Sequence, residues 1–305
     1  MKNIKSITVT YLSKITFASL NGADKEVDNI NPIKKLTLAN GAELPYVSSQ
    51  ALRRALRDGL VEMGWPESQV QEASAKKGAP KTQIKPAEYI EDDLFGYMDA
   101  APSKVEKGKG TSVVRTSPVR VEAMVALNEY KGDMDYATNY MAKGMKNDKG
   151  EELQPNIFET EIHSGIYRGT ILIELDRIGC GQGFENISDL SAAEKCKRTL
   201  AFLDAFRNLW SSGRQTRFLA DISPKFIAAA AMTTKNPVFL EAVQINKEGQ
   251  VNADALKSVV ADYDRFIAGH VFAVQEAVFG KPIETVSLKE GFETIESWIK
   301  NHFGQ

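Results

Sequence analysis

The sequence predicts an α+β fold, in which strands and amphipathic helices build a common core. The stretches 4–20 and 112–127 alternate apolar and polar residues, as strands with one buried face do. The stretches 48–64 and 191–209 instead repeat apolar residues at helical spacing. With 305 residues, 43% of them hydrophobic, the chain is long enough for a sizeable core.

The first strand is expected at residues 4–20, where β-branched and aromatic residues alternate with polar ones. A polar loop follows it and carries the adjacent Lys34 and Lys35. A helix is then expected from Ser48 to about Gly64.

This helix has two different faces and a polar start. Ser48 or Ser49 can accept a hydrogen bond from a free N–H group of the first turn. The leucines share the face that packs on the core, and a second arc gathers Gln50, Arg53, Arg54 and Arg57. Solvated arginines are the simplest interpretation, but the helix dipole and free N–H groups also favour a bound phosphate.

The remaining elements are expected in this order: a short helix near 88–96, strands at 112–127 and 161–178, a helix at 191–209, strands at 218–222 and 237–245, and helices at 252–279 and 288–303. The main elements therefore run strand, helix, strand, strand, helix, strand. This order, βαββαβ, is the split ferredoxin-like plan.

Charge and composition limit the function. The net charge of −2 means that any nucleic-acid site must be a local basic patch. The two cysteines give neither a disulfide framework nor a zinc spacing, and they fit a reducing cytoplasm. Neither a signal sequence nor an apolar run of about 18 residues is present, so we expect a cytoplasmic protein without a membrane partner.

The sequence contains no Walker, GxSxG, HExxH or EF-hand motif, and its three histidines are too scattered for a metal cluster. No catalytic residue, metal or cofactor is therefore expected. The loop 179–183 follows a strand, but its spacing is GxGxG and not GxGxxG. It leaves one alternative open, a nucleotide-using metabolic enzyme.

Basic loops at 76–85, 104–120 and 213–217 indicate a polyanion partner more clearly. Further motifs lie at 48–57 (the Ser-Ser-Gln helix), 93–96 (Asp-Leu-Phe-Gly), 116–119 (Thr-Ser-Pro-Val), 158–168 and 213–216. In this order along the whole chain, they are similar to the backbone subunit of type I CRISPR Cascade complexes, especially its DevR-like branch.

The resemblance implies an RNA-recognition-like (RRM-like) palm with a finger insertion and a thumb β-hairpin. The palm would comprise residues 1–66, 113–128 and 163–305, the finger insertion 67–112 and the thumb 129–162. Copies of such a subunit stack head to tail along one CRISPR guide RNA, next to other Cascade subunits. Target DNA pairs with the guide in antiviral defence, while the protein holds the backbone and is not an enzyme.

The resemblance also implies contacts to the guide RNA. The serines and the helix N-terminus would hold phosphate oxygens, and the arginines would add charge and bidentate hydrogen bonds. Tyr136 would stack at a displaced base or, alternatively, pack within the thumb. The implied RNA-binding residues are Asn21, Lys34, Lys35, Ser48, Ser49, Gln50, Arg53, Arg54, Arg57, Tyr136, His163, Arg168, Arg214, Gln215 and Arg217.

A catalytic alternative comes from backbone subunits of type III complexes, which resemble this plan. Those subunits cut target RNA with an aspartate in the loop after the first strand, where this chain has Asp24 and Asp28. The DevR-like motifs favour type I, whose backbone subunit does not cut.

Overall fold

The computed structural model describes residues 3–24, 29–72, 80–101, 111–139, 143–153, 156–210, 215–282 and 284–305. The strands are β1 (Ser6–Ala18), β2 (Ile30–Asn31), β3 (Lys35–Thr37), β4 (Glu43–Val47), β5 (Tyr97–Ala101), β6 (Thr111–Arg115), β7 (Val119–Val121), β8 (Met124–Ala126), β9 (Met134–Asn139), β10 (Asn156–Glu161), β11 (His163–Glu174), β12 (Phe226–Met232), β13 (Ile267–Val274) and β14 (Val286–Ser287). The helices are α1 (Ser49–Glu62), α2 (Ile90–Phe95), α3 (Ala192–Arg207), α4 (Gln215–Phe218), α5 (Ala253–Asp262), α6 (Glu276–Phe279) and α7 (Leu288–Phe303).

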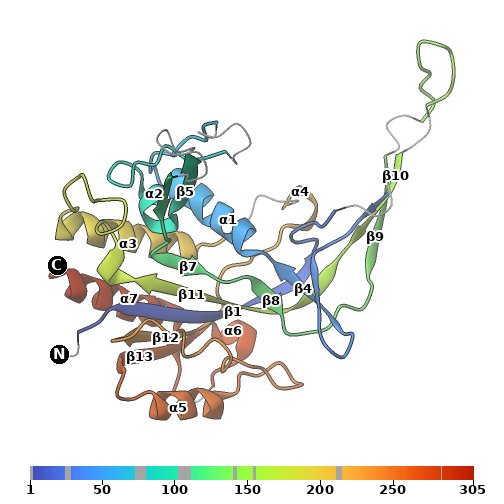
Figure 1. Cartoon of the computed structure of the whole chain (residues 1–305). Helices are drawn as coiled ribbons and strands as arrows, with labels where there is room; N and C mark the ends of the chain where they lie inside the picture. Colours follow the sequence, from blue (N-terminus) through green and yellow to red (C-terminus); the bar gives the residue numbers. More distant parts are fainter. Residues whose placement is uncertain are drawn as a thin grey trace.

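Within the described residues, a nine-stranded sheet forms the centre of the molecule (Figure 1). Its strands lie in the order β14-β13-β12-β1-β11-β8-β4-β3, and β7 also pairs with β11. Strand β1 is antiparallel to both of its neighbours, β11 and β12. Along the chain, β1, α1, β7, β11, α3 and β12 follow the predicted order of strands and helices. The predicted α+β class is therefore confirmed.

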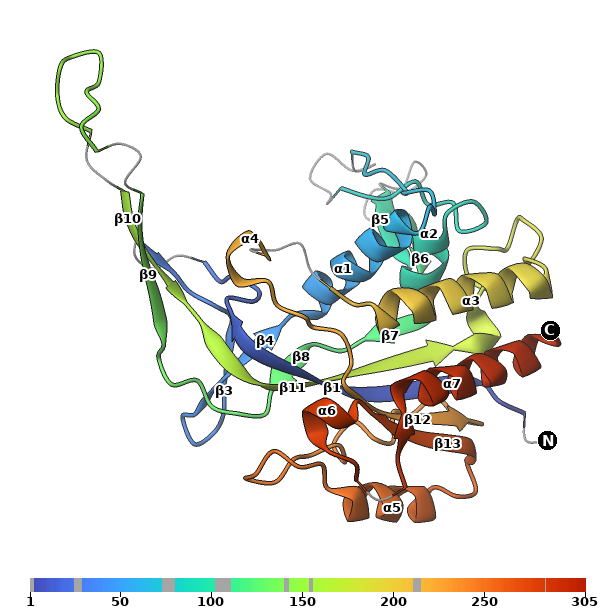
Figure 2. The ribbon, with the colours of Figure 1, turned by 180° about the vertical axis from the view of Figure 1, so that it is seen from behind.

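The sheet separates two hydrophobic cores. In β12, Ile227 and Ala229 belong to the first core and Phe226 and Ala228 to the second, because neighbouring residues of a strand point to opposite faces. Helices α1, α3 and α7 cover the first core, whereas α5 and the segment 237–251 cover the second (Figure 2). Every residue of β12 is buried, as expected for a strand that is covered on both faces.

Several predictions of local structure are wrong. Residues 218–222 form no strand, since α4 ends at Phe218 and irregular chain follows. Residues 237–245 fold into turns. The helix predicted over 252–279 ends at Asp262 and gives way to β13. The strand predicted over 112–127 is divided into β6, β7 and β8, and β6 pairs with β5 outside the central sheet.

Two parts extend from the central sheet. The projecting hairpin consists of β9, β10 and the loop 143–153, and it reaches well beyond the end of the sheet (Figure 1). Strand β2 pairs in parallel with β10, so the segment after β1 joins its base. The α2 insertion comprises the described residues between 67 and 115 and lies beside α1 and α3 (Figures 1 and 2). Helix α2 confirms the short helix predicted near 88–96.

Candidate nucleic-acid interface

The N-terminus of α1 is held by three polar side chains. Ser48 caps the helix, because its hydroxyl oxygen accepts a hydrogen bond from the Ala51 N–H at 3.3 Å. The side-chain oxygen of Asn21 accepts from the Ser48 N–H at 2.7 Å, and the Ser49 hydroxyl donates to the Val121 carbonyl at 2.6 Å. The predicted serine cap is confirmed. These contacts fix the start of α1 between the end of β1 and β7.

Two of the three predicted arginines of α1 make internal contacts. Arg53 donates a hydrogen bond to the Phe95 carbonyl, and its guanidinium lies 5.5 Å from the centre of the Phe95 ring. Arg57 pairs with Glu91 at 3.0 Å and lies 4.8 Å from the same ring. Burial, together with the nearby Arg57 charge, lowers the pKa of Arg53 to about 10. Both arginines therefore attach the α2 insertion to α1.

Arg54 and Gln50 lie on the solvent-exposed part of the helix. The Arg54 side chain is 63% exposed; it pairs with Asp58 at 2.7 Å, one turn further along α1, and more weakly with the exposed Glu67 at 3.6 Å. The hydrogen bond to Asp58 raises the pKa of Arg54, so its guanidinium stays charged. An exposed ion pair contributes little to stability, and a phosphate can replace the carboxylate at small cost.

Lys35 is part of a polar cluster at the base of the projecting hairpin. Its Nζ atom lies 2.8 and 3.0 Å from the two carboxylate oxygens of Glu161 and 4.4 Å from the centre of the Tyr130 ring. The Ile33 N–H also donates to Glu161, at 2.9 Å. Lys34 is half-buried, and it forms no ion pair with any residue in the described ranges. The charge of Lys35 is therefore compensated by Glu161, whereas the charge of Lys34 has no carboxylate partner within the described ranges.

His163 and Arg168 lie in β11 and make internal contacts. The His163 ring is buried, and its Nδ1 atom lies 2.8 Å from the Tyr167 hydroxyl. Burial lowers the pKa of His163, so the ring is held in its neutral form. Arg168 donates to the Val243 carbonyl at 3.2 Å and pairs with Glu241 at 3.3 Å. Both contacts stabilise the central sheet and its second core.

Arg217 connects α4 to the projecting hairpin. It pairs with Asp135 and donates to the Thr160 hydroxyl at 3.4 Å, and its guanidinium lies 5.1 Å from the Phe158 ring. Tyr136 follows Asp135 in β9, so its side chain points to the opposite face of the hairpin, where it is 59% exposed. Gln215 begins α4, whereas Arg214 lies outside the described residues.

An exposed apolar group beside α4 was missing from the sequence prediction. Phe17, at the end of β1, lies 5.4 Å from Phe218 between ring centres and is 46% exposed. Leu219 is 81% exposed and follows α4 directly. Apolar side chains on a solvated surface favour an interaction site. The sequence gives no separate signal for this group, because Phe17 belongs to the apolar alternation of β1 and Leu219 directly follows the last residue of α4.

Two alternative sites were predicted, a nucleotide loop at 179–183 and a catalytic aspartate in the loop after β1. In the glycine-rich loop, the Cys180 and Gln182 carbonyls accept hydrogen bonds from Arg115, and the Gly179 N–H donates to Asp93 at 3.0 Å. The loop thus turns its carbonyl oxygens toward an arginine of the same chain, whereas a phosphate loop presents N–H groups. In the first loop, Asp24 is exposed and Asp28 lies outside the described residues.

Two features are absent from the described part of the chain. It contains no group of three or more His, Cys, Asp or Glu residues arranged to hold a metal ion. It also contains no helix long and apolar enough to cross a membrane.

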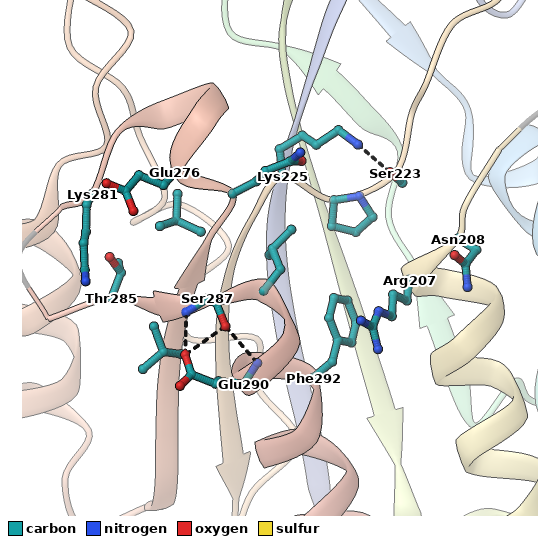
Figure 3. A pocket seen from close by; sticks show the side chains of 15 residues that line it. Arg207, Asn208, Ser223, Lys225, Glu276, Lys281, Thr285, Ser287, Glu290 and Phe292 are labelled. Atoms are coloured by element: carbon teal, nitrogen blue, oxygen red, sulfur yellow. Dashed lines mark hydrogen bonds between the residues drawn. The ribbon is translucent and has the colours of Figure 1, made fainter.

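A separate groove of about 740 Å³ lies near the start of α7 (Figure 3). Its charged lining residues are Arg207, Lys225, Lys281, Glu276 and Glu290. Ser287 and Glu290 form a capping box, in which the Ser287 N–H donates to the Glu290 carboxylate at 2.9 Å. The first turn of α7 therefore already has its own carboxylate. None of the predicted RNA-binding residues lines this groove.

The comparisons with known proteins agree with the predicted family. Residues 9–253 match the family described as "CRISPR-associated negative auto-regulator DevR/Csa2". The chain is 27% identical over 272 residues to the "CRISPR-associated protein Cas7/Cst2/DevR" of Myxococcus xanthus (strain DK1622), a match that covers 86% of this chain and 82% of the relative.

Solved structures share the fold at low sequence identity. One chain of a "CRISPR RNA-guided surveillance complex" has a TM-score of 0.60 and 16% identity, and the match covers 96% of this chain and 99% of that one. A chain of a complex described as "pre-nicking" has a TM-score of 0.59 and 14% identity, with 97% and 100% covered. The fold and the family match together define a Cas7-type protein. This chain belongs to the DevR/Csa2 family.

Proposed function

We propose that this protein is the guide-RNA-binding backbone subunit of a type I CRISPR Cascade complex, and that copies of it stack head to tail along one guide. The observation that carries the proposal is the α1–α4 surface, which comprises the capped start of α1, α4 and the facing side of the projecting hairpin (Figures 1 and 2). There a helix N-terminus, the exposed Arg54 and the exposed Phe17 lie on neighbouring elements. The DevR/Csa2 family match supports the same function.

In this proposal the central sheet and its helices form an RRM-like palm of residues 1–66, 113–128 and 163–305. The projecting hairpin supports the assignment of residues 129–162 as a thumb, because it extends well beyond the end of the central sheet (Figure 1). The α2 insertion corresponds to the fingers, residues 67–112. Because β6 pairs with β5 as far as Arg115, an end of this insertion at residue 115 is favoured over the predicted end at residue 112.

The predicted RNA-binding residues fall into two groups, those that would touch the guide and those that would hold the binding surface in place. The contacts to phosphate oxygens would come from the Ser48 hydroxyl, from the backbone N–H groups of Ser49 and Gln50, and from the side chains of Arg54 and Lys34. Tyr136, on the face of the hairpin that points away from Arg217, would stack on a displaced base. Arg53 and Arg57 would instead hold the α2 insertion in place, through Phe95 and Glu91. The remaining residues would keep the surface in position through their internal contacts: Asn21, Lys35, His163, Arg168 and Arg217. Arg214 and Gln215 remain proposed contacts at the start of α4.

The wider function follows from the same proposal. Guide and target recognise each other by base pairing, so the subunit needs a sequence-independent grip on the backbone. Other Cascade subunits and target DNA paired to the guide would be its further partners in antiviral defence in the cytoplasm.

The test is the affinity of the full-length chain for labelled single-stranded RNA, measured over a range of salt concentrations. Arg54→Glu combined with Lys34→Glu should weaken binding at least tenfold. It should also flatten the dependence of log K on log salt by about 0.7 for each phosphate contact that is lost. Lys289→Glu, an exposed lysine of α7, is the matched control and should bind like the wild type. A wild-type protein without RNA affinity at low salt would contradict the proposal.

The proposed role as a structural subunit has its own test. Guide-loaded protein is incubated with complementary RNA and Mg²⁺, and the RNA is then examined for cuts. Intact RNA is expected. Cuts at regular spacing that disappear in Asp24→Ala or Asp28→Ala would establish the type III-like alternative.

A further inference from the structure

A basic groove, separate from both the α1–α4 surface and the groove near α7, lies on the face of the sheet that points away from α1. Ile15 of β1 packs in the first core, below α1, so the adjacent Lys14 and Thr16 point to the opposite face. There they line a groove of about 960 Å³ together with Lys131 and Lys247. We call this feature the lysine groove.

Three segments that are far apart in the sequence are fixed around this groove. The Leu127 N–H donates to the Ile166 carbonyl at 2.7 Å, and the Asn128 side chain accepts from the Ile166 N–H at 3.0 Å. These bonds hold the segment that carries Lys131 against β11. The turn that carries Lys247 is closed by Asn246, whose side-chain oxygen accepts from two backbone N–H groups at 3.0 and 2.9 Å. The lysines therefore stand on ordered backbone.

The charge of the groove is largely uncompensated. Lys14 and Lys247 are exposed, and within the described ranges neither forms an ion pair. Lys131 pairs with Glu129 at 3.1 Å, but both side chains are exposed, so this pair is weak and readily exchanged. Three ammonium groups thus face one carboxylate in the groove.

We propose that the lysine groove binds the sugar–phosphate backbone of a single-stranded nucleic acid. This inference rests on the proposed function and extends it to a second face of the subunit. Ammonium groups recognise phosphates as point charges without regard to sequence. Among the described residues that line the groove, none is aromatic, so bases would not stack there. Its apolar lining residues are Ile15, which is buried in the first core, and Leu127 and Ile166, which pack against the second.

The position of the groove separates it from the α1–α4 surface. The groove and the start of α1 lie on opposite faces of the sheet. The bound backbone belongs either to a distant segment of the guide or to the strand that pairs with it. The chemistry is the same for both, and the experiment distinguishes them.

The test uses the full-length chain with Lys14→Glu and Lys247→Glu, with Lys14→Gln and Lys247→Gln as a milder variant and Lys289→Glu as the matched control. The first arm measures affinity for a labelled single-stranded RNA over a range of salt concentrations. The second arm measures the binding of a labelled complementary DNA strand to RNA-loaded protein. We expect the charge reversal to weaken binding at least tenfold in one arm, and to reduce the salt slope by about 0.7 for each lost contact. The neutral variant should show a smaller loss, and the control none.

Loss in the first arm assigns the groove to the guide, and loss confined to the second arm assigns it to the complementary strand. Binding within twofold of the wild type in both arms overturns the inference and leaves the proposed function intact. That result is also the one expected if the groove receives an acidic protein segment. A wild-type protein that binds no RNA overturns the proposed function as well, so the two failures are distinguishable.

Discussion

The arginines of α1 and the lysines of the groove are basic residues with opposite roles in the structure. Arg53 and Arg57 reach acceptors of the α2 insertion, Phe95 and Glu91, and are half-buried there. Lys14 and Lys247 stay exposed on ordered backbone. A basic cluster in the sequence therefore does not identify a nucleic-acid contact by itself. The tertiary partner decides whether a charge supports the fold or is free for phosphate.

The largest expected effect concerns the most internal charges. Asp93 is fully buried and pairs with Arg115 and, at 3.0 Å, with Arg198, which joins α2, β6 and α3. Asp93→Ala would leave the buried Arg115 guanidinium without a carboxylate and would leave Arg198 with Glu194 alone, at 3.0 Å. Urea unfolding should show a loss of about 3–5 kcal/mol, as for other broken buried pairs. The same substitution at the exposed Asp189 should change stability by less than about 0.5 kcal/mol.

The contrast within α1 gives the next largest effect. Arg57→Glu would place two carboxylates together beside Phe95, and we expect a loss of about 2 kcal/mol, less than for a fully buried pair. Arg54→Glu should change the free energy of unfolding by less than about 0.5 kcal/mol but weaken RNA binding. If Arg57→Glu instead unfolds like the wild type, the internal role assigned to this arginine is wrong.

Tyr136 tests the free surface of the projecting hairpin. Because its side chain is exposed, Tyr136→Ala should leave the unfolding free energy unchanged. RNA affinity should fall by about 1 kcal/mol, the low end for stacking of a base on an aromatic ring. Tyr136→Phe keeps the ring and is the matched control. A loss of stability without loss of affinity would mean that the tyrosine packs within the hairpin.

The smallest expected effect is a pH dependence from His163. Burial lowers the pKa of His163 in the folded protein, below its unfolded value of about 6.5. The resulting stability is fully present above about pH 6.5 and is lost as the pH falls toward the folded pKa. The stability of His163→Gln should therefore depend less on pH below about 6.5. Burial also lowers the pKa of His302, but this contribution cancels in the comparison.

Local patterns were sufficient for the elements that have one exposed side. The period of α1, α3 and α7 is visible in the sequence because each buries one face. Most of β1 is buried on both faces, but it still alternates because Ser6, Thr8 and Thr10 are polar. In contrast, β12 reads Phe-Ile-Ala-Ala-Ala-Ala-Met, is buried on both faces and does not alternate. Strand β13 lies between α5 and α6 and was included in a predicted helix. Its second half is also buried throughout and does not alternate.

In the candidate site, too, local contacts could be predicted from the sequence, whereas contacts between distant segments could not. The Ser48 cap depends on residues three positions apart, so the sequence contains all that is needed. The partners of Arg53 and Arg57 come from a helix much later in the chain, and one sequence alone gives no sign of this packing. Phe17 and Phe218 also meet only in the folded protein, next to the exposed Leu219. The lysine groove likewise requires three distant segments to meet at β11.

The most direct test of a backbone role is a nuclease footprint on RNA that copurifies with the full-length protein. If copies stack along one guide, limited RNase digestion should leave protected RNA with cuts at a regular interval. The protected length should increase with the number of copies in each particle, measured by light scattering. Protein without bound RNA, or RNA that is digested as fast as free RNA, would contradict a backbone subunit.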